Sequence, residues 1–339
     1  MKTHCIPIVI ACIFLGHAAD VKPLMLERGA PIIEESFAKG LDTNRWSVAI
    51  GSWRAENGVL IGKEQEDDHH AAVVKTAFSN ITAVMQFNFM LKGTASFSFS
   101  INDASGHNSR VTVSAIDTTL RKDADKKDAR TFSVVLDNAG SALKPDVWHT
   151  MTIEMNKDEM LARIDDSIFL IGAHPGINRE KKDFGFPVNG EVHFDDVKVW
   201  QAKESAEWQS EKQKLIAKSA SRPKADYTGN PQAAYAIAES RTRWRLMQND
   251  AKFKALVDAR ASLSESLAKT FPVVNQKSEK AKNEVKRLAK EDENYKKMTS
   301  DLRKAQADER NHLFEQDKEA KALFDAIAAS RAKAVAKTQ

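Results

Sequence analysis

The chain has 339 residues, of which 42% are hydrophobic and 29% charged, an ordinary soluble composition that leaves room for two domains. Residues 202–339 hold 29 Lys and Arg against 20 Asp and Glu, whereas the rest of the chain holds 22 against 27. The asymmetry indicates an acidic N-terminal module joined to a basic C-terminal one. A Gly-rich phosphate loop, Cys-x-x-Cys and Gly-x-Ser-x-Gly are absent from the sequence, which argues against the site classes that they mark.

The N-terminus has the pattern of a signal peptide, which we assign to residues 1–19. A charged start at Lys2 precedes an apolar stretch of twelve residues, 5–16, and small residues follow at Ala18 and Ala19. The apolar stretch is too short to span a bilayer as a helix of the mature protein. We therefore expect cleavage near Ala18 or Ala19 and a secreted or periplasmic protein.

Both cysteines, Cys5 and Cys12, lie in this segment, so the mature chain would have none. A secreted protein without cysteine has no disulfide framework and depends on its hydrophobic core. In a competing interpretation, residues 9–12 form a lipobox and Cys12 carries a lipid. The apolar run before Cys12 is short and continues through residues 13–15, so lipoprotein anchoring is the less favoured alternative.

Residues 27–201 are expected to form an antiparallel β-sandwich, because short alternating runs are separated by turn residues. In 84–90 and 96–100, phenylalanines alternate with other residues, which predicts that the Phe side chains point inward and the polar ones outward. Residues 52–61 predict a hairpin that turns at Asn57-Gly58. Further strands are expected at 71–76, 83–91, 95–101, 110–115 and 131–136.

The clearest alternation lies in residues 146–200. Thr150, Thr152 and Glu154 alternate there with Met151 and its neighbours on the other face. Further runs are expected at 160–164, 168–171 and 192–199. Nothing between these runs is long enough for a crossover helix, which argues against a parallel sheet.

The same segment resembles a known family. It reads Trp-His-x-Met-x-Ile-Glu from Trp148, Asp-Glu-Met-x-Ala-x-Ile-Asp from Asp158, Phe-Gly-Phe-Pro from Phe184 and His-Phe-Asp-Asp-Val-Lys-Val-Trp from His193. With these motifs, residues 31–201 resemble the 3-keto-disaccharide hydrolase domain family.

The opening of that family also has counterparts in this chain, at residues 35–37, at Trp46 and at residues 51–62. The resemblance implies a concanavalin-like jelly roll and, for an enzyme, hydrolysis of the glycosidic bond of a 3-keto sugar. The spacings are more specific for the fold than for the activity, because one fold carries many functions.

Residues 203–339 are expected to be helical, since glycine nearly vanishes and Ala, Lys, Glu and Arg dominate. The predicted helices cover 203–220, 232–270 with an interruption near Asn249-Asp250, and 277–337, and the predicted breaks fall at 221–231 and Pro272.

Apolar residues at coiled-coil-like spacing mark the last predicted helix. They are Leu288, Tyr295, Met298, Leu302 and Ala305, and the stripe resumes at Leu313 after a slip of four residues. Glu291 and Glu309 fall on the stripe and make it thin. We therefore predict a helical hairpin or a loose coiled-coil-like bundle that serves self-association or a cell-envelope partner.

Polar side chains near predicted turns give a candidate ligand site of four residues, His70, Asp103, His107 and Arg110. Histidine can act as a base or a hydrogen-bond partner near neutral pH, and Asp and Arg suit sugar hydroxyls. Surface turn chemistry is the alternative, because Asp-x-Ser-Gly is an ordinary turn sequence. We expect these residues to contact a carbohydrate, and we assign no catalytic acid or base.

Other chemistry has less support in the sequence. Glycoside hydrolysis usually needs two carboxylates, and the nearest arrangement, Glu64, Glu66 and Asp68, fits a solvated connection better. His69 and His70 follow acidic residues, but adjacent residues of a strand face opposite ways, which weakens a metal site. Neither a metal nor a cofactor is predicted.

The cluster Arg241-x-Arg243-Trp244-Arg245 suggests a nucleic-acid surface. Export argues against that partner, and interleaved charges on helices usually form a solvated face. We therefore expect a carbohydrate partner and no nucleic acid. Three functions stay open: a hydrolase, a non-catalytic glycan-binding module, and a scaffold whose sandwich caps a helical assembly domain. An exposed aromatic row would favour the module, and a filled apolar face would favour the scaffold.

Overall fold

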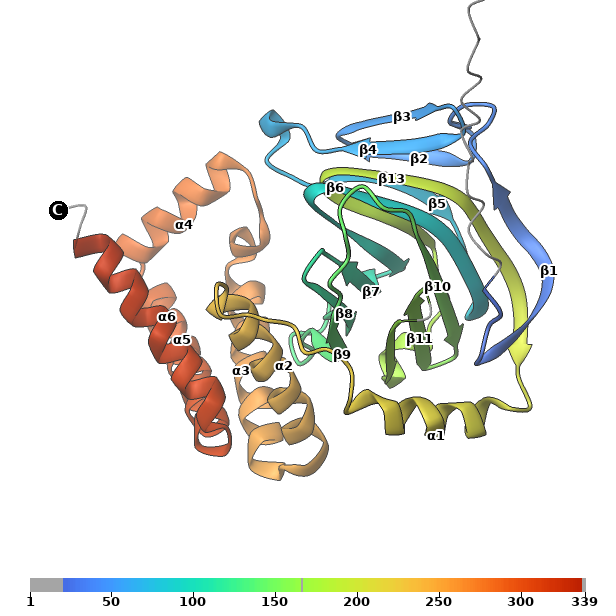
Figure 1. Cartoon of the computed structure of the whole chain (residues 1–339). Helices are drawn as coiled ribbons and strands as arrows, with labels where there is room; N and C mark the ends of the chain where they lie inside the picture. Colours follow the sequence, from blue (N-terminus) through green and yellow to red (C-terminus); the bar gives the residue numbers. More distant parts are fainter. Residues whose placement is uncertain (1–20, 166, 337–339) are drawn as a thin grey trace, which may run out of the picture.

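The structure, a computed structural model, describes residues 21–165 and 167–336. The expected signal peptide, both cysteines and the lipobox lie outside the described residues. Among the described residues, an antiparallel β region comes first and six α-helices follow it (Figure 1). The predicted fold class, an antiparallel β-sandwich followed by an α-helical region, is confirmed.

Every strand pairing among the described residues is antiparallel. The strands are β1 (Leu26–Glu35), β2 (Trp46–Ile50), β3 (Ser52–Glu56), β4 (Val59–Lys63), β5 (Ala72–Ala77), β6 (Thr82–Asp103), β7 (Gly106–Val113), β8 (Asp117–Lys122), β9 (Val134–Gly140), β10 (His149–Asn156), β11 (Glu159–Ile164), β12 (Ile168–Ala173) and β13 (Asp183–Glu204). The predicted hairpin turn at Asn57-Gly58 joins β3 to β4, with positive φ at both residues.

Two strands of 22 residues each, β6 and β13, pair along their length and belong to both layers. The halves 82–92 of β6 and 191–201 of β13 form sheet I, with β10, β11 and β12 on one side and β1 on the other. The β3–β4 hairpin pairs with the same side of β13 at residues 191–194. The other halves, 96–102 and 183–189, form sheet II, in the order β9-β8-β7-β6-β13-β5-β2. The sandwich is therefore one continuous sheet folded across two long strands.

Glycines lie where both long strands pass from one layer to the other. Gly93 in β6 and Gly190 in β13 have φ of +60° and +77°, and the pairing register shifts between Asn189 and Glu191. Only glycine adopts these angles without a steric penalty. The sequence predicted two strands, 83–91 and 95–101, where the structure has the single bent strand β6.

Phenylalanines fill the space between the layers, as the alternation predicted. Phe97 and Phe99 of β6 and Phe186 and Phe194 of β13 are all less than 2% exposed, and the rings of the last two stack at 4.3 Å. Each buried aromatic side chain contributes on the order of 2 kcal/mol through its removal from water. The serines between these phenylalanines consequently face out of sheet II.

A buried carboxylate fastens the N-terminal segment to the outer face of sheet I. Glu154 of β10 is fully buried, and its oxygens accept the backbone N–H groups of Leu24, Met25 and Leu26 at 2.6–3.0 Å. The guanidinium of Arg163 lies 3.5 Å from the same carboxylate. Helix α1 (Trp208–Ser219) packs in the same cluster, through its Trp208.

Replacing this carboxylate by an amide should loosen the N-terminal segment. Glu154→Gln presents an NH₂ group to backbone N–H donors, so buried donors lose their acceptor. We expect the free energy of unfolding in urea to fall by about 3 kcal/mol. Glu34→Gln, on an exposed position of β1, is the control and should leave the midpoint unchanged. Equal stability of the two variants would contradict this role of Glu154.

Short breaks separate the remaining five helices that the structure describes. They are α2 (Pro231–Asn249), α3 (Ala251–Thr270), α4 (Glu279–Glu291), α5 (Glu293–Gln316) and α6 (Lys318–Ala336), and the 3₁₀ turns are η1 (Glu66–Asp68), η2 (Pro175–Ile177) and η3 (Pro272–Asn275). At the breaks, Asp250, Asp292 and Asp317 each accept the backbone N–H of the residue three positions later. The run predicted as one helix over 277–337 is therefore three helices.

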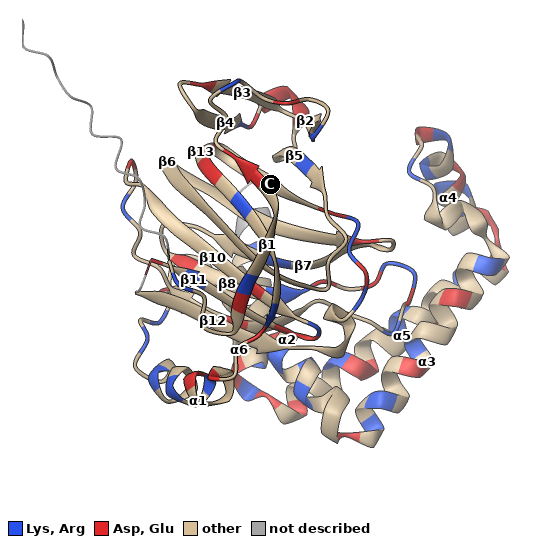
Figure 2. Cartoon of the chain, turned by 90° about the vertical axis from the view of Figure 1, so that its right-hand side faces the viewer, with Lys and Arg blue, Asp and Glu red and all other residues tan. Residues whose placement is uncertain are grey.

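Residues of the predicted apolar stripe pack against other helices of the same chain. Leu288, Tyr295, Met298 and Leu302 pack with Leu267 in one small core. Lys and Arg alternate with Asp and Glu along the helices (Figure 2). Among the described helices, none is long and apolar enough to cross a membrane.

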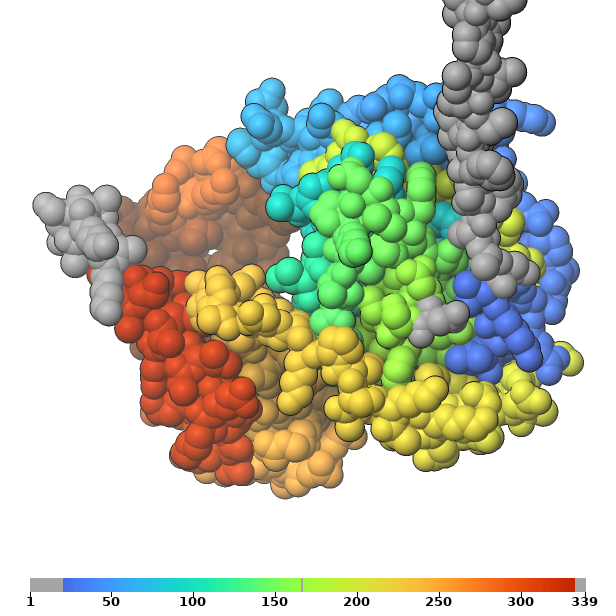
Figure 3. All heavy atoms as spheres, viewed as in Figure 1, coloured from blue at the N-terminus to red at the C-terminus, as the bar shows by residue number. Residues whose placement is uncertain are grey.

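The linker between α1 and α2, residues 220–230, and α2 itself cover the edge of sheet II at β9. Arg222 forms a bidentate ion pair with Asp137 at 2.7 and 2.8 Å, and the N–H of Gly140 donates to the carbonyl of Pro223. The hydroxyl of Ser240 in α2 accepts the N–H of Val135 at 2.6 Å. The linker runs against the strands without a gap in the space-filling view (Figure 3). An unpaired edge is prone to pair with other chains, and these contacts cover it.

Removing the hydroxyl at the edge should expose β9. Ser240→Ala leaves the N–H of Val135 without its acceptor, and the loss of about 1.4 kcal/mol corresponds to roughly tenfold faster amide exchange in 134–140. Hydrogen exchange read by mass spectrometry measures the rate. Ser262→Ala, on an exposed position of α3, is the control. Unchanged exchange in β9 would show that α2 does not protect this edge.

Candidate functional site

The outer face of sheet II carries a polar pocket of about 440 Å³. Its floor is a row of residues paired directly across the strands: Lys75 of β5, Gly185 of β13, Ser100 of β6 and Arg110 of β7. Gly185 and Ser100 are small, whereas the residues at either end are long and cationic. Neighbouring strands lie about 4.8 Å apart, so the backbones at Lys75 and Arg110 are separated by roughly 14 Å, which is three strand spacings. The row is thus a shallow trough between two cations.

A second row of hydrogen-bonded side chains adjoins the first. The amide nitrogen of Asn102 donates to Asp183, and its oxygen lies 2.7 Å from Nδ1 of His107. Because that amide oxygen can only accept, Nδ1 of His107 carries the proton. Nε2 is then the acceptor, and nothing else in the described part of the chain bonds to it. The row orients His107 with its lone pair available to a ligand.

A β-bulge brings His107 to this face. The pairing shifts by one residue between Ile101 and Asn102, so that Asn102 lies opposite His107 while Ile101 lies opposite Ser109. In a regular strand, residues three apart face opposite sides, and His107 and Arg110 would be separated. The extra residue, Asn108, turns inward and is fully buried. Bulges commonly re-aim side chains in this way.

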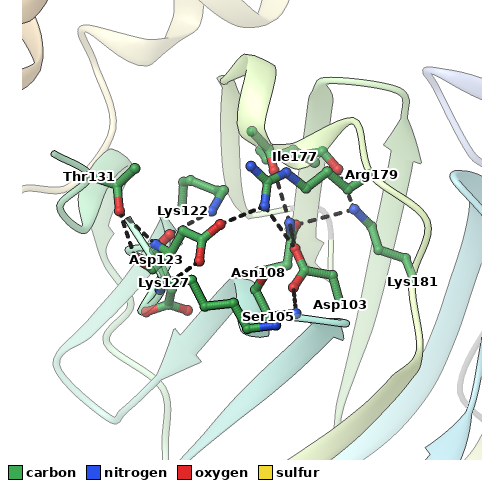
Figure 4. Close-up of polar contacts among 12 residues, drawn as sticks. Asp103, Ser105, Asn108, Lys122, Asp123, Lys127, Thr131, Ile177, Arg179 and Lys181 are labelled. Atoms are coloured by element: carbon green, nitrogen blue, oxygen red, sulfur yellow. Dashed lines mark hydrogen bonds and ion pairs between the residues drawn. The ribbon is translucent and has the colours of Figure 1, made fainter. Parts of the chain in front are cut away.

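Asp103 does not lie in the pocket. It is 6% exposed, and its oxygens accept the N–H of Ser105 at 2.7 Å and the amide of Asn108 at 2.9 Å. Figure 4 shows it beside Asn108, near Arg179 and Lys181. This arrangement fixes the β6–β7 turn, so Asp103 serves the structure of the site and does not reach the pocket.

The other three predicted residues line one pocket. His107 and Arg110 come from β7, and His70 reaches the rim from the loop after η1. Nδ1 of His70 lies 2.8 Å from the carbonyl oxygen of Ala71. The structure therefore brings together His70, His107 and Arg110 and leaves Asp103 outside.

Arg110, the cation at the β7 end of the trough, pairs with Asp123, and Arg121 pairs with the same carboxylate. Nε and Nη2 of Arg110 donate to Asp123 at 2.8 and 3.0 Å, and Arg121, its neighbour across β8, lies 3.1 Å from the same carboxylate. Two guanidinium groups thus share one negative charge. The group as a whole stays positive.

The surroundings keep His107 neutral. Burial lowers the pKa of His107 from its usual 6.5, the positive charge of Arg110 lowers it further, and Asp123 opposes the shift. A neutral imidazole at pH 7 can accept a hydrogen bond from a hydroxyl group through Nε2.

The pocket holds neither a free carboxylate pair nor an aromatic platform. No Asp or Glu belongs to its described lining, and Asp123 and Asp183 beside it are engaged by arginines and by Asn102. Its aromatic groups are the imidazoles of His70 and His107. No cluster of three or more metal-ligating side chains occurs among the described residues. The site therefore offers hydrogen bonds and positive charge.

The predicted site set left out five polar residues of the pocket, which are Lys75, Ser98, Ser100, Asn102 and Asn189. Alternation in β6 contained the signal, because Phe97, Phe99 and Ile101 point inward and the even-numbered residues must face out. The same parity places Asp103 on the opposite side from Asn102. Lys75 had no signal of its own, since its position depends on the pairing of β5 with β13.

A larger cavity of about 640 Å³ lies between the linker, α2 and α6. Its principal polar groups are already paired: Arg222 with Asp137, Arg241 with Asn138, and Thr242 with Asp317. The first two contacts join the linker and α2 to β9 of the sandwich, and the third joins α2 to the start of α6, so we assign the cavity to the junction.

No family model matches the chain, and no curated protein matches it. Solved structures match about half of it. A carbohydrate-binding module CBM66 from Bacillus subtilis is 13% identical over 46% of this chain and 95% of its own, with a TM-score of 0.39. A Bacillus licheniformis beta-glucanase is 8% identical over 52% and 100%, with a TM-score of 0.42.

A protein of unknown function with a galectin-like fold from Bacillus subtilis is 14% identical over 53% of this chain and 100% of its own, with a TM-score of 0.42. For all three structures the identity is below 25% and the TM-score below 0.5. These likenesses therefore say nothing about what this chain binds or does.

Removing the cation beside His107 should raise the pKa of His107. Arg110→Gln abolishes the repulsion that disfavours the imidazolium and leaves Asp123 less neutralised, and both changes favour protonation. An NMR titration of the imidazole Cε1–H signal measures the pKa. Arg54→Gln, an exposed arginine on β3, is the control. A fall in the pKa of His107 would contradict the arrangement described.

Proposed function

We propose that this chain is an exported carbohydrate-binding protein whose sugar site is the trough on the outer face of sheet II. The observation that carries the proposal is the direct row Lys75–Gly185–Ser100–Arg110 beside the hydrogen-bonded His107. The pocket there measures about 440 Å³ and is open to solvent-borne ligands.

The residues that line the trough suit both the ring and the hydroxyl groups of a sugar. Ser100 is small, so a ring can lie close to the sheet beside the Lys75 side chain, and hydroxyl groups meet donors and acceptors on both sides. Ser98, Asn102 and His107 provide neutral partners, which hold hydroxyls without the desolvation cost of a full charge. Such convergent polar groups in a concave site are typical of ligand pockets.

Binding without catalysis is the function that these groups support best. Glycoside hydrolysis usually requires an acid and a second carboxylate on either side of the scissile bond, and the described lining has neither. The scaffold alternative has less support, since the outer face of sheet II is polar and hollow instead of apolar and filled.

A second candidate is cleavage of a glycosidic bond in a 3-keto sugar, as the resemblance over residues 31–201 implies. The row Asp183–Asn102–His107 favours it, because a neutral imidazole oriented through Nδ1 can serve as a general base through Nε2. In that case His107→Ala would abolish the release of monosaccharide.

A glycan-binding and hydrolysis screen of the full chain tests both candidates. We expect at least one polysaccharide or oligosaccharide to bind, no product to form, and His107→Ala to weaken binding by about tenfold, the effect of one lost hydrogen bond to a buried group. Calorimetry measures the affinity, and chromatography detects products, with 3-keto-disaccharides among the substrates.

His69→Ala is the matched control, because His69 is exposed and outside the pocket lining. Product that disappears in His107→Ala would replace binding by hydrolysis as the function. Failure of every glycan to bind would refute both candidates. Binding that His107→Ala leaves unchanged would place the sugar away from the trough.

A further inference from the structure

The charge of the trough narrows the class of sugar. Its row ends in Lys75 on one side and in Arg110 and Arg121 on the other, and one carboxylate, Asp123, lies among them. Asp183 adds a second carboxylate, in the adjoining row, where the amide of Asn102 donates to it. The cations therefore outnumber the anions along this face.

Lys75 has an ammonium group available to a ligand. Its side chain lies over Gly185, where an added Cβ would be 2.9 Å from Cγ of Lys75 and still closer to the carbonyl oxygen of Val74. Within the described part of the chain, no carboxylate or carbonyl bonds this ammonium. The glycine thus leaves room for the lysine to lie across the trough with its charge unneutralised.

The opposite end keeps donors as well. Arg110 uses Nε and Nη2 on Asp123, and Nη1 has no hydrogen-bond partner among the described residues. Arg121 forms an ion pair with the same carboxylate, Asp123. Partly enclosed cations of this kind interact with an anion more strongly than surface lysines do, because less water screens them.

Neutral acceptors lie between the two charged ends. Nε2 of His107 and the hydroxyls of Ser98 and Ser100 suit the hydroxyl groups of a pyranose ring. A ligand that matches the whole trough therefore carries hydroxyls in the middle and a negative charge toward each end.

We propose that the trough binds an acidic glycan, a chain of pyranose residues whose anionic groups pair with Lys75 and with Arg110. This inference rests on the proposed function and specifies its ligand. Carboxylate groups of hexuronic acids and sulfate esters both supply the required charge, and the experiment separates them.

Calorimetry with the full chain and four probes of similar length tests the proposal: trigalacturonate, trimannuronate, a κ-carrageenan tetrasaccharide, which carries sulfate esters and no carboxylate, and cellotriose. We expect at least one acidic probe to bind at least tenfold more tightly than cellotriose, and its affinity to fall as salt rises. Preference for either of the first two assigns carboxylates, and preference for the third assigns sulfate.

Lys75→Gln shows where the acidic probe lies. It should reduce the ratio of the acidic to the neutral affinity by about tenfold, which is about 1.4 kcal/mol. Lys203→Gln removes an exposed charge from the far end of β13 and should leave that ratio unchanged. An unchanged thermal midpoint confirms that both variants are folded.

Three results would overturn the inference. Equal affinities for cellotriose and the acidic probes would refute the charge argument and leave carbohydrate binding intact. Acidic binding that Lys75→Gln does not change would place the anion on another surface. Failure of all four probes to bind, together with a negative glycan screen, would refute the proposed function itself.

Discussion

The structure depends on two long strands that bend together. β6 and β13 remain paired along almost their whole length, so any bend in one must be matched in the other. Gly93 and Gly190 allow the turn with positive φ, and beyond it both strands present their phenylalanines to the same interior. The inward direction of the aromatic residues decides which residues face outward. The polar trough on sheet II is thus the reverse side of the core.

Polar groups of the sandwich bond to polar groups of the helical region, and both would lose their partners if the two parts were separated. Asp137 of β9 accepts two hydrogen bonds from Arg222 and one from the N–H of Ile171, while Ser240 bonds the strand edge. Glu154 similarly depends on the backbone of the N-terminal segment. Buried polar groups without partners cost more than their bonds contribute. The full chain is consequently the appropriate unit for functional work.

Periodicity in the sequence predicted the sandwich, the hairpin at Asn57-Gly58 and the helix break near Asp250. It could not predict the breaks at Asp292 and Asp317, because an aspartate within a charged helical run is read as a solvated residue until its side chain is seen to cap the next helix. Long-range pairing was equally inaccessible, and β13 therefore extends to Glu204, where a helix was predicted to have begun.

Three of the residues that the sequence singled out as polar groups near turns, His70, His107 and Arg110, line one pocket in the structure. Asp103, the fourth residue that the sequence singled out, lies outside that pocket, and its odd position among inward-facing residues already indicated this. The convergence of His107 with Arg110 depends on a bulge, which one extra residue creates and which local propensity does not show. Lys75 lies in the pocket only because β5 pairs with β13, which places it opposite Gly185.

The central claim is that a glycan occupies the outer face of sheet II, and the histidines report its position directly. Imidazole NMR signals of the full chain, recorded while trigalacturonate is added, test it. The account predicts that the signal of His107 shifts most and that of His70 follows, while His174 at the helical junction and His312 within the helices stay unchanged. Shifts confined to His174 or His312 would place the ligand at the helical region and contradict the account.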